Sequence, residues 1–371
     1  MGGTLSYQFA TGSPLASSEQ GNRMKTICFF NNKGGVGKTT LTCNIAAQFA
    51  AAGQRVIVID GDPQCNATQL ILGDAEVLGL YWPEDGATPK SQTLLDVVSP
   101  LQDGDSSILT GVVPLAASSN RFGVSLLPGH PKFSLTDDKL SQAWQETLSG
   151  DIGGFRKMNW GRILCSAWAN DYDVAFIDIG PSLGPINRSF MLACDYFVTP
   201  LGADVFSLIG VRNIGDWLQD WISLYDSGVE LCDKRTPGKL DSHGIDRHLP
   251  VKNGYAGYTL QQYIAKSKAG VRRPTATFEK VIKHVPAEIA KSLASYLVDG
   301  LTAESAKLGD VPNMYSLIPL AQLANAPLNR LQATDGMVGS QFKQAEDYAG
   351  IYKTFAERLA QNVGINFGAH P

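Results

Sequence analysis

The chain has 371 residues and a mass of 39.8 kDa, which is long for one ordinary domain but within reach of a single α/β domain that carries insertions. A net charge of −4 with 18% charged residues is typical of a globular protein and by itself predicts no nucleic-acid partner. No apolar run approaches the roughly 20 residues of a membrane-spanning helix. The six cysteines include no C-x-x-C pair, which argues against a locally held metal cluster and favours reduced thiols in a cytoplasmic protein.

Residues 1–23 are rich in Gly, Ser and Thr and lack both a basic start and a continuous apolar segment. They do not resemble a secretory signal. We expect a mobile leader here and the start of the fold at Met24.

Strand-like apolar runs alternate with helical patterns along the rest of the chain. The expected strands are residues 26–30, 55–60, 123–129, 173–180, 196–201, 255–264 and 314–320, and helical patterns cover 38–52, 160–170, 209–225, 277–298 and 339–362. This order predicts an α/β fold in which a doubly wound, mainly parallel sheet carries helices on both faces. Two stretches interrupt it, 73–120 and 226–253, and we interpret them as insertions or long loops in one domain spanning 24–371.

The segment NNKGGVGKTT, residues 31–40, joins the first expected strand to the first expected helix. Glycines at such a junction let backbone N–H groups turn toward phosphate oxygens, and the helix presents its positive end to the same anion. The expected nucleotide-binding residues of this loop are Gly34, Gly35, Val36, Gly37, Lys38, Thr39 and Thr40. Lys38 would place a charge on the β- and γ-phosphates and Thr39 a hydroxyl on Mg²⁺. The strict pattern has its first glycine where Asn32 stands, and Lys33 is an additional lysine without an assigned partner.

Aspartates follow two later strands, at the sheet edge where doubly wound proteins bind ligands. Asp60 and Asp62 lie at the end of strand 55–60, and Asp62 could orient or deprotonate an attacking water. Asp178 follows a buried apolar strand, the usual position of an aspartate that binds Mg²⁺ in a P-loop protein. Turn formation alone would also explain the Asp-Pro pair at 62–63.

Four segments, KGGVGKTT, DGDPQCNATQ, FIDIGPSLGPINRS and DYFVTPLGADVFSLIGV, resemble in order and spacing the deviant Walker A ATPases of the ParA/MinD (SIMIBI) class. The ParA-like branch is the most similar, and the likeness extends from Met24 to about Gly364. The resemblance implies a P-loop NTPase fold, ATP and Mg²⁺ as ligands, ATP hydrolysis, an ATP-sandwich homodimer and a partner protein that stimulates hydrolysis. Gly180 departs from the family, which has the first proline of a P-P-S motif there.

The resemblance also implies residue roles. Lys33 matches the signature lysine that reaches the partner subunit's phosphates, which would make dimerisation depend on ATP. Lys38 and Asp62 match the P-loop lysine and the carboxylate that positions water, and Thr39 and Asp178 match the Mg²⁺ ligands. Two further residues fall where the family lines its adenine pocket, namely Gln261 and Pro319.

Positive charge is concentrated in residues 231–291, which contain 12 Lys and Arg against 5 Asp and Glu. The candidate nucleic-acid contacts are Lys266, Lys268, Arg272 and Arg273. Contacts of such residues with phosphates would be independent of sequence and sensitive to salt, as partition-type ATPases require. A solvated basic face is the competing interpretation.

Two alternatives remain open. The chain could be an ATP-gated docking subunit of a larger complex, such as one for secretion, polymer synthesis or phage defence, with LGLYWPED at 78–85 as a contact surface. It could also act at a membrane surface, as Min-type relatives do. That interpretation requires a basic amphipathic tail, and no Lys or Arg follows Arg358, so we expect no membrane anchor.

Overall fold

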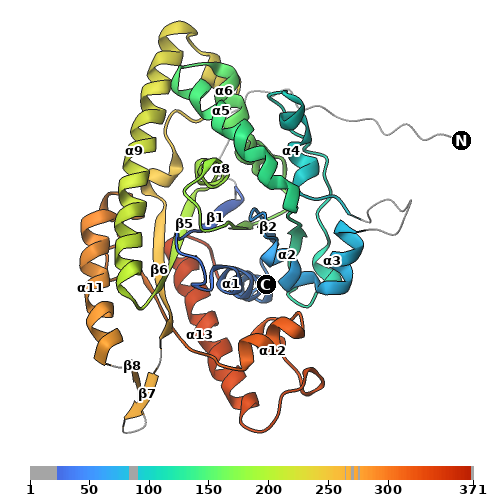
Figure 1. Ribbon diagram of the computed structural model, residues 1–371, viewed down its shortest axis with the longest axis vertical. Coiled ribbons are helices and arrows are strands. Elements are labelled where there is room, and N and C mark those ends of the chain that lie inside the picture. Colours follow the sequence, from blue (N-terminus) through green and yellow to red (C-terminus); the bar gives the residue numbers. More distant parts are fainter. Residues whose placement is uncertain (1–22, 83–90, 264, 269–270, 275, 369–371) are drawn as a thin grey trace, which may run out of the picture.

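The computed structural model describes residues 23–82, 91–263, 265–268, 271–274 and 276–368 (Figure 1). The expected leader, apart from Arg23, therefore lies outside the described residues. No helix within the described ranges has the length and apolar character needed to cross a bilayer.

A seven-stranded sheet forms the centre of the molecule, and every neighbouring pair of its strands is parallel. In spatial order the strands are β3 (Ser125–Leu127), β2 (Val56–Asp60), β4 (Val174–Asp178), β1 (Lys25–Phe29), β5 (Tyr196–Gly202), β6 (Tyr255–Tyr263) and β9 (Lys307–Pro312). A separate antiparallel hairpin consists of β7 (Ala265–Lys268) and β8 (Val271–Pro274). The predicted mainly parallel α/β sheet is confirmed.

The two faces of the sheet carry two separate cores, because alternate side chains of a strand point to opposite sides. Ile27 and Phe29 belong to one core and Cys28 to the other, and all three are fully buried. The first core is covered by α1 (Lys38–Ala51), α2 (Asn66–Leu72), α12 (Leu317–Leu323) and α13 (Gln341–Asn362). The second is covered by α4 (Leu94–Asp103), α5 (Thr136–Leu148), α6 (Ile152–Met158), α7 (Trp160–Ala167), α8 (Pro185–Ala193), α9 (Val205–Arg235), α10 (Lys239–Ser242) and α11 (Ala276–Ser292). Figure 1 shows α13 and α5 on opposite sides of the strands.

The strand predicted at 314–320 is wrong. The seventh strand is β9, Lys307–Pro312, and the predicted segment leads into α12. Leu317 and Ala321, four residues apart, are the buried members of α12, which is helical spacing. The sequence of β9 does not look like a strand, because it contains Gly309. The absence of a side chain at Gly309 leaves room for the ring of Phe355.

The two interrupting stretches contain more helix than we expected. Residues 73–120 include α3 (Asp74–Tyr81) and α4, and the long helix α9 continues through Arg235 into the segment 226–253. Gly228 lies in this part of α9, where a Cβ atom would be 2.5 Å from the carbonyl oxygen of Thr147. The glycine that looked like a loop residue therefore permits the close approach of α9 to α5.

A second glycine contact gives a stability prediction. A Cβ atom on Gly215 of α9 would lie 2.4 Å from the carbonyl oxygen of Ser292 at the end of α11. Gly215→Ala should separate these helices and lower the free energy of unfolding by about 1 to 3 kcal/mol in urea titrations. The control is Gly350→Ala in α13, where no atom lies within 4 Å of the added carbon. It should raise stability by about 0.4 to 1 kcal/mol, and equal effects of the two substitutions would contradict the argument.

Candidate functional site

The glycine-rich loop is held between β1 and the start of α1. Gly35 and Gly37 have φ angles of 71° and 77°, in the left-handed region that favours glycine. The Asn31 side chain donates a hydrogen bond to the Pro200 carbonyl at 2.6 Å and accepts the N–H of Lys33 at 3.0 Å. The loop is thereby tied to β5, the strand next to its own.

Asn32, which stands where the strict pattern has glycine, faces α9. A Cβ atom on Gly210 of that helix would lie 2.9 Å from the Asn32 side-chain oxygen. Gly210 of the helix thus leaves room for the Asn32 side chain of the loop, a contact that the sequence did not predict.

Lys38 is buried at the first position of α1, and its ammonium donates to the carbonyl oxygen of Lys33 at 3.3 Å. Burial lowers the pKa of Lys38, and the carboxylates of Asp178 and Asp62 oppose this shift. The lysine thus lies beside two carboxylates and the positive end of a helix, an arrangement that suits an anion coordinated together with a cation.

Thr39 and Asp178 meet across α1 and β4. The Thr39 hydroxyl donates to one oxygen of Asp178 at 2.7 Å, and the Thr42 hydroxyl donates to the other at 3.3 Å. The Asp178 carboxyl is fully buried, and burial raises its pKa to about 6. Hydroxyl and carboxylate oxygens are the hard ligands that Mg²⁺ prefers.

The described residues contain no cluster of three or more His, Cys, Asp and Glu side chains that could hold a metal ion by themselves. Mg²⁺ typically binds through one or two carboxylates together with substrate phosphates and water. The pair Thr39 and Asp178 beside the glycine loop fits that mode of binding.

Asp60 and Asp62 have different surroundings although they are two residues apart. Asp60 is fully buried and accepts the Thr68 N–H at 2.7 Å and the Thr68 hydroxyl at 2.6 Å. Burial, with the nearby charge of Asp178, raises the pKa of Asp60 to about 7. Asp62 lines the cavity described below and accepts the Gln64 N–H at 2.9 Å. A Cβ atom on Gly180 would lie 3.2 Å from the Asp62 carboxylate, so the departure at Gly180 leaves space beside this carboxylate.

Two cavities adjoin the glycine loop. The larger, of about 880 Å³, is lined by residues of the loop, of the segment that follows β2, of α2 and of α12. The lining residues named in the sequence prediction are Gly34, Gly35, Gly37, Lys38, Thr39, Thr40, Asp62 and Pro319. The smaller, of about 210 Å³, is lined by Gln261 and Pro319 together with Gly37, Thr40 and residues 311–315. The Gln261 side chain is buried and donates to the Thr259 hydroxyl at 2.8 Å. Val36 is buried and lines neither cavity.

Lys33 is directed elsewhere. Its ammonium pairs with Asp204 at 2.5 Å, and it does not line either cavity. Asp204 is the N-cap of α9, where its carboxylate accepts the N–H groups of Phe206 and Ser207. Sequence reasoning missed Asp204, although an aspartate just before a helical pattern is an N-cap signal.

The tentative nucleic-acid residues belong to the hairpin of β7 and β8. The backbone register sets Lys266 opposite Arg273 and Lys268 opposite Val271. Figure 1 shows the hairpin projecting beyond the end of β6, next to α11. The backbone of all four residues belongs to this hairpin, which is separate in the chain from the glycine loop at 31–40.

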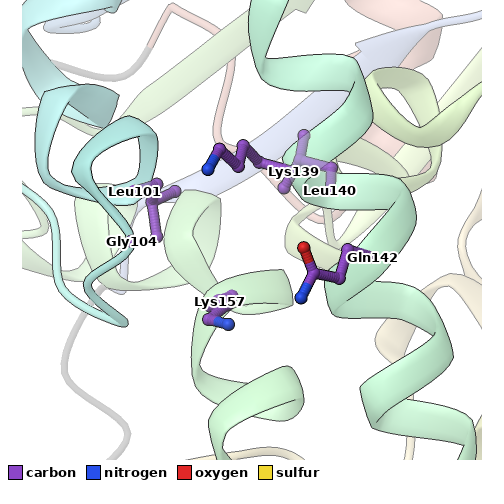
Figure 2. A pocket seen from close by; sticks show the side chains of 6 residues that line it. All are labelled: Leu101, Gly104, Lys139, Leu140, Gln142 and Lys157. Carbon is purple, nitrogen blue, oxygen red and sulfur yellow. The ribbon is translucent and has the colours of Figure 1, made fainter.

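A third hollow, of about 150 Å³, lies between α4, α5 and α6 (Figure 2). Its lining residues are Leu101, Gly104, Lys139, Leu140, Gln142 and Lys157. Lys157 is paired with Glu146 at 2.9 Å. None of the residues predicted for the site lines this hollow, so we assign it no part in nucleotide chemistry.

Comparisons with known proteins show the family of the chain. A family model described as "AAA domain" matches residues 24–227. The chromosome partitioning protein ParA of Caulobacter vibrioides is 29% identical over 194 residues, which are 52% of this chain and 61% of ParA. The chromosome-partitioning ATPase Soj of Thermus thermophilus is 29% identical over 193 residues, 52% of this chain and 60% of Soj. The matches thus span about three fifths of these relatives.

Solved structures extend the likeness over more of the chain. Protein DIP2308 from Corynebacterium diphtheriae is 36% identical, with a TM-score of 0.66 over 81% of this chain and 97% of that protein. The ATP complex of a McdA variant from Cyanothece has a TM-score of 0.59 at 16% identity, over 93% of this chain and 98% of McdA. At that identity the second likeness concerns the fold alone.

The raised pKa values of Asp60 and Asp178 predict how stability changes with pH. In the folded protein the Asp60 carboxyl stays protonated up to about pH 7 and the Asp178 carboxyl up to about pH 6. In the unfolded chain both carboxyls lose their protons near pH 4. The free energy of unfolding of the nucleotide-free protein should therefore fall as pH rises between about 4 and 7. The slope should approach about 1.4 kcal/mol per pH unit for each such carboxyl.

Urea titrations from about pH 4.5 to pH 7.5 measure this slope. Asp60→Asn should flatten it, because the amide does not titrate. A pH profile of Asp60→Asn parallel to that of the unchanged protein would show that Asp60 is not its source.

Proposed function

We propose that this chain, which belongs to the "AAA domain" family and is a ParA/MinD-type P-loop ATPase, uses bound ATP to switch from a monomer to an ATP-sandwich homodimer. One observation carries the proposal: Thr39 and Asp178 meet at 2.7 Å beside Lys38, and Thr39 and Lys38 line the 880 Å³ cavity. The backbone of the glycine loop, the Lys38 ammonium, the Thr39 hydroxyl and the Asp62 carboxylate thus line one cavity, and Asp178 is hydrogen-bonded to Thr39.

The roles within one chain follow from these positions. Lys38 and the N-terminus of α1 would hold the β- and γ-phosphates. Thr39 and Asp178 would hold Mg²⁺, which when bound neutralises charge on the phosphate oxygens. Asp62, which lines the same cavity, would orient the attacking water and accept its proton.

The smaller cavity would take the base. Gln261 lines the smaller cavity and Pro319 of α12 lines both cavities, so a base and its phosphates could occupy the two spaces together. The Gln261 amide nitrogen already donates to Thr259. Its carbonyl oxygen is therefore the atom available to accept a hydrogen bond from an adenine amino group.

Dimerisation is supported by the surface around Lys33. Val205, Phe206 and Ile209 on the first turns of α9 are exposed by 54%, 67% and 45%. Apolar side chains exposed together next to a lysine that does not serve its own cavity suit a surface that a second copy covers. In the dimer Lys33 would contact the nucleotide of the partner subunit.

The output that we propose is binding to DNA without sequence preference, in partition or positioning, with release when a partner protein stimulates hydrolysis. The support is the relatives' role in chromosome partitioning and the four basic residues on the β7 and β8 hairpin. On α11, the helix after the hairpin, Lys280, Lys283 and His284 are exposed. Together they would form a basic edge that contacts phosphates.

A second candidate output is docking to another protein. Trp82 and Leu78 are exposed by 83% and 64% at the end of α3, and Asp74 of the same helix lines the large cavity. An exposed tryptophan at the end of a helix whose first residue lines the cavity suits a surface that reports the nucleotide state to a partner. In that case the ATP-bound protein would capture a partner and would not be retained on DNA.

Two substitutions test the switch. Asp62→Ala should slow ATP hydrolysis by about 10² to 10⁴-fold while ATP still binds, because only the group that activates water is lost. This variant should sediment as a dimer with Mg²⁺ and ATP and as a monomer with ADP. Adding Lys33→Ala should return it to a monomer that still binds ATP. Persistence of Asp62→Ala as an ATP-bound monomer would overturn the sandwich mechanism.

The DNA output has a separate test. Retention on DNA of arbitrary sequence at low salt should require ATP and should be lost on Arg272→Glu with Arg273→Glu. In a plot of the logarithm of the DNA-binding constant against the logarithm of the salt concentration, the slope should become shallower by about 0.9 for each phosphate contact removed. The control is Lys343→Glu with Lys353→Glu, the same change of charge on exposed positions of α13. Retention without ATP, or equal loss in the control, would favour the docking output instead.

A further inference from the structure

Lys33 and Asp204 connect the nucleotide loop to the start of α9, across 171 residues of sequence. The ammonium and the carboxylate are 2.5 Å apart, and the two side chains are 36% and 35% exposed. The pair is therefore formed at the surface, where another group can compete for either partner.

Asp204 is held in place by more than Lys33. One carboxylate oxygen accepts the N–H of Phe206 at 3.0 Å and of Ser207 at 3.2 Å, which caps α9. The other oxygen lies where a Cβ atom on Gly202 would be 2.7 Å away, so the chain leaves room for it only because that residue is glycine. Asp204 cannot follow Lys33 if the lysine moves.

The backbone of Lys33 is equally well fixed. Its N–H donates to Asn31 and its carbonyl oxygen accepts from Lys38. Movement of Lys33 therefore means rotation of its long side chain from a fixed base. Burial raises the pKa of Asp204, but the hydrogen bond and charge of Lys33 outweigh it and hold that pKa below its ordinary value. The Asp204 carboxyl is thus held in its negative form while Lys33 is paired with it.

We propose that Asp204 is a positioning residue that holds Lys33 in the monomer and must release it when the nucleotide of a second copy arrives. A γ-phosphate within hydrogen-bond distance of the Lys33 ammonium in its present position would lie next to the Asp204 carboxylate, and like charges at that distance repel. The lysine must turn away from Asp204 to serve the phosphate. Breaking the pair therefore opposes dimerisation and raises the dissociation constant of the ATP-bound dimer. This inference rests on the proposed function.

Asp204→Asn isolates this role. Asparagine is as good an N-cap as aspartate, so α9 should keep its first turn while the charge that holds Lys33 is lost. With Mg²⁺ and ATP the variant should dimerise about 2- to 30-fold more tightly than the unchanged protein, because two half-exposed ion pairs, one in each subunit, no longer have to be broken. Without nucleotide both proteins should be monomers, and the variant should melt at most a few degrees lower, because it loses one half-exposed ion pair and keeps its N-cap. Asp204→Ser, another good N-cap, provides a second variant.

Analytical ultracentrifugation over a range of protein concentrations gives the dimer dissociation constants. Asp216→Asn removes one charge from an exposed position of the same helix and should leave the constant unchanged. Equal tightening in Asp216→Asn would show a general charge effect and overturn the inference, as would an unchanged or weaker dimer of Asp204→Asn. If neither the unchanged protein nor Asp204→Asn dimerises with ATP, the proposed switch itself is wrong.

Discussion

The register of the three central strands is the constraint on which the site depends. Parallel pairing sets Asp178 beside Phe29 on one side and beside Asp60 on the other, so the ends of β1, β2 and β4 meet at one edge of the sheet. The glycine loop leaves β1 at that edge, and α1 returns Thr39 to Asp178. A shift of one residue in any of these strands would turn the aspartate toward a core instead of the loop. The relative positions of the site residues are therefore fixed by strands that are buried on both faces.

The long helix α9 links this edge to the rest of the molecule. Its N-cap Asp204 holds Lys33, and Gly210 lies against Asn32 in the glycine loop. Further along, Gly215 contacts the end of α11, and Arg212 pairs with Glu288 of that helix. The basic hairpin directly precedes α11. One rigid helix thus touches both the nucleotide loop and the element that follows the hairpin, which is the arrangement needed for a nucleotide to influence a distant surface.

Most of the sheet could be predicted because its strands are short, apolar runs next to turn residues. The runs at 55–60 and 173–180 are buried on both sides, and burial of that kind leaves a direct compositional mark. The strand at 307–312 could not be found, since Gly309 and Asp310 make it look like a loop, and the apolar segment after it attracted the prediction instead. Helix α5 was missed because its buried positions include Thr136 and Thr147, whose polarity hides the helical period.

The sequence by itself predicted that the glycine loop, Asp62 and Asp178 lie together, because each is a local pattern at the end of a strand and parallel strands end at the same edge. It also determined the family, through the order of those patterns. Only the tertiary structure decided that Lys33 is held by Asp204, that Gly210 makes room for Asn32, and that Gln261 reaches the smaller cavity. These contacts join residues far apart in the chain, and their geometry is set by how α9 and β6 pack rather than by any neighbouring residue.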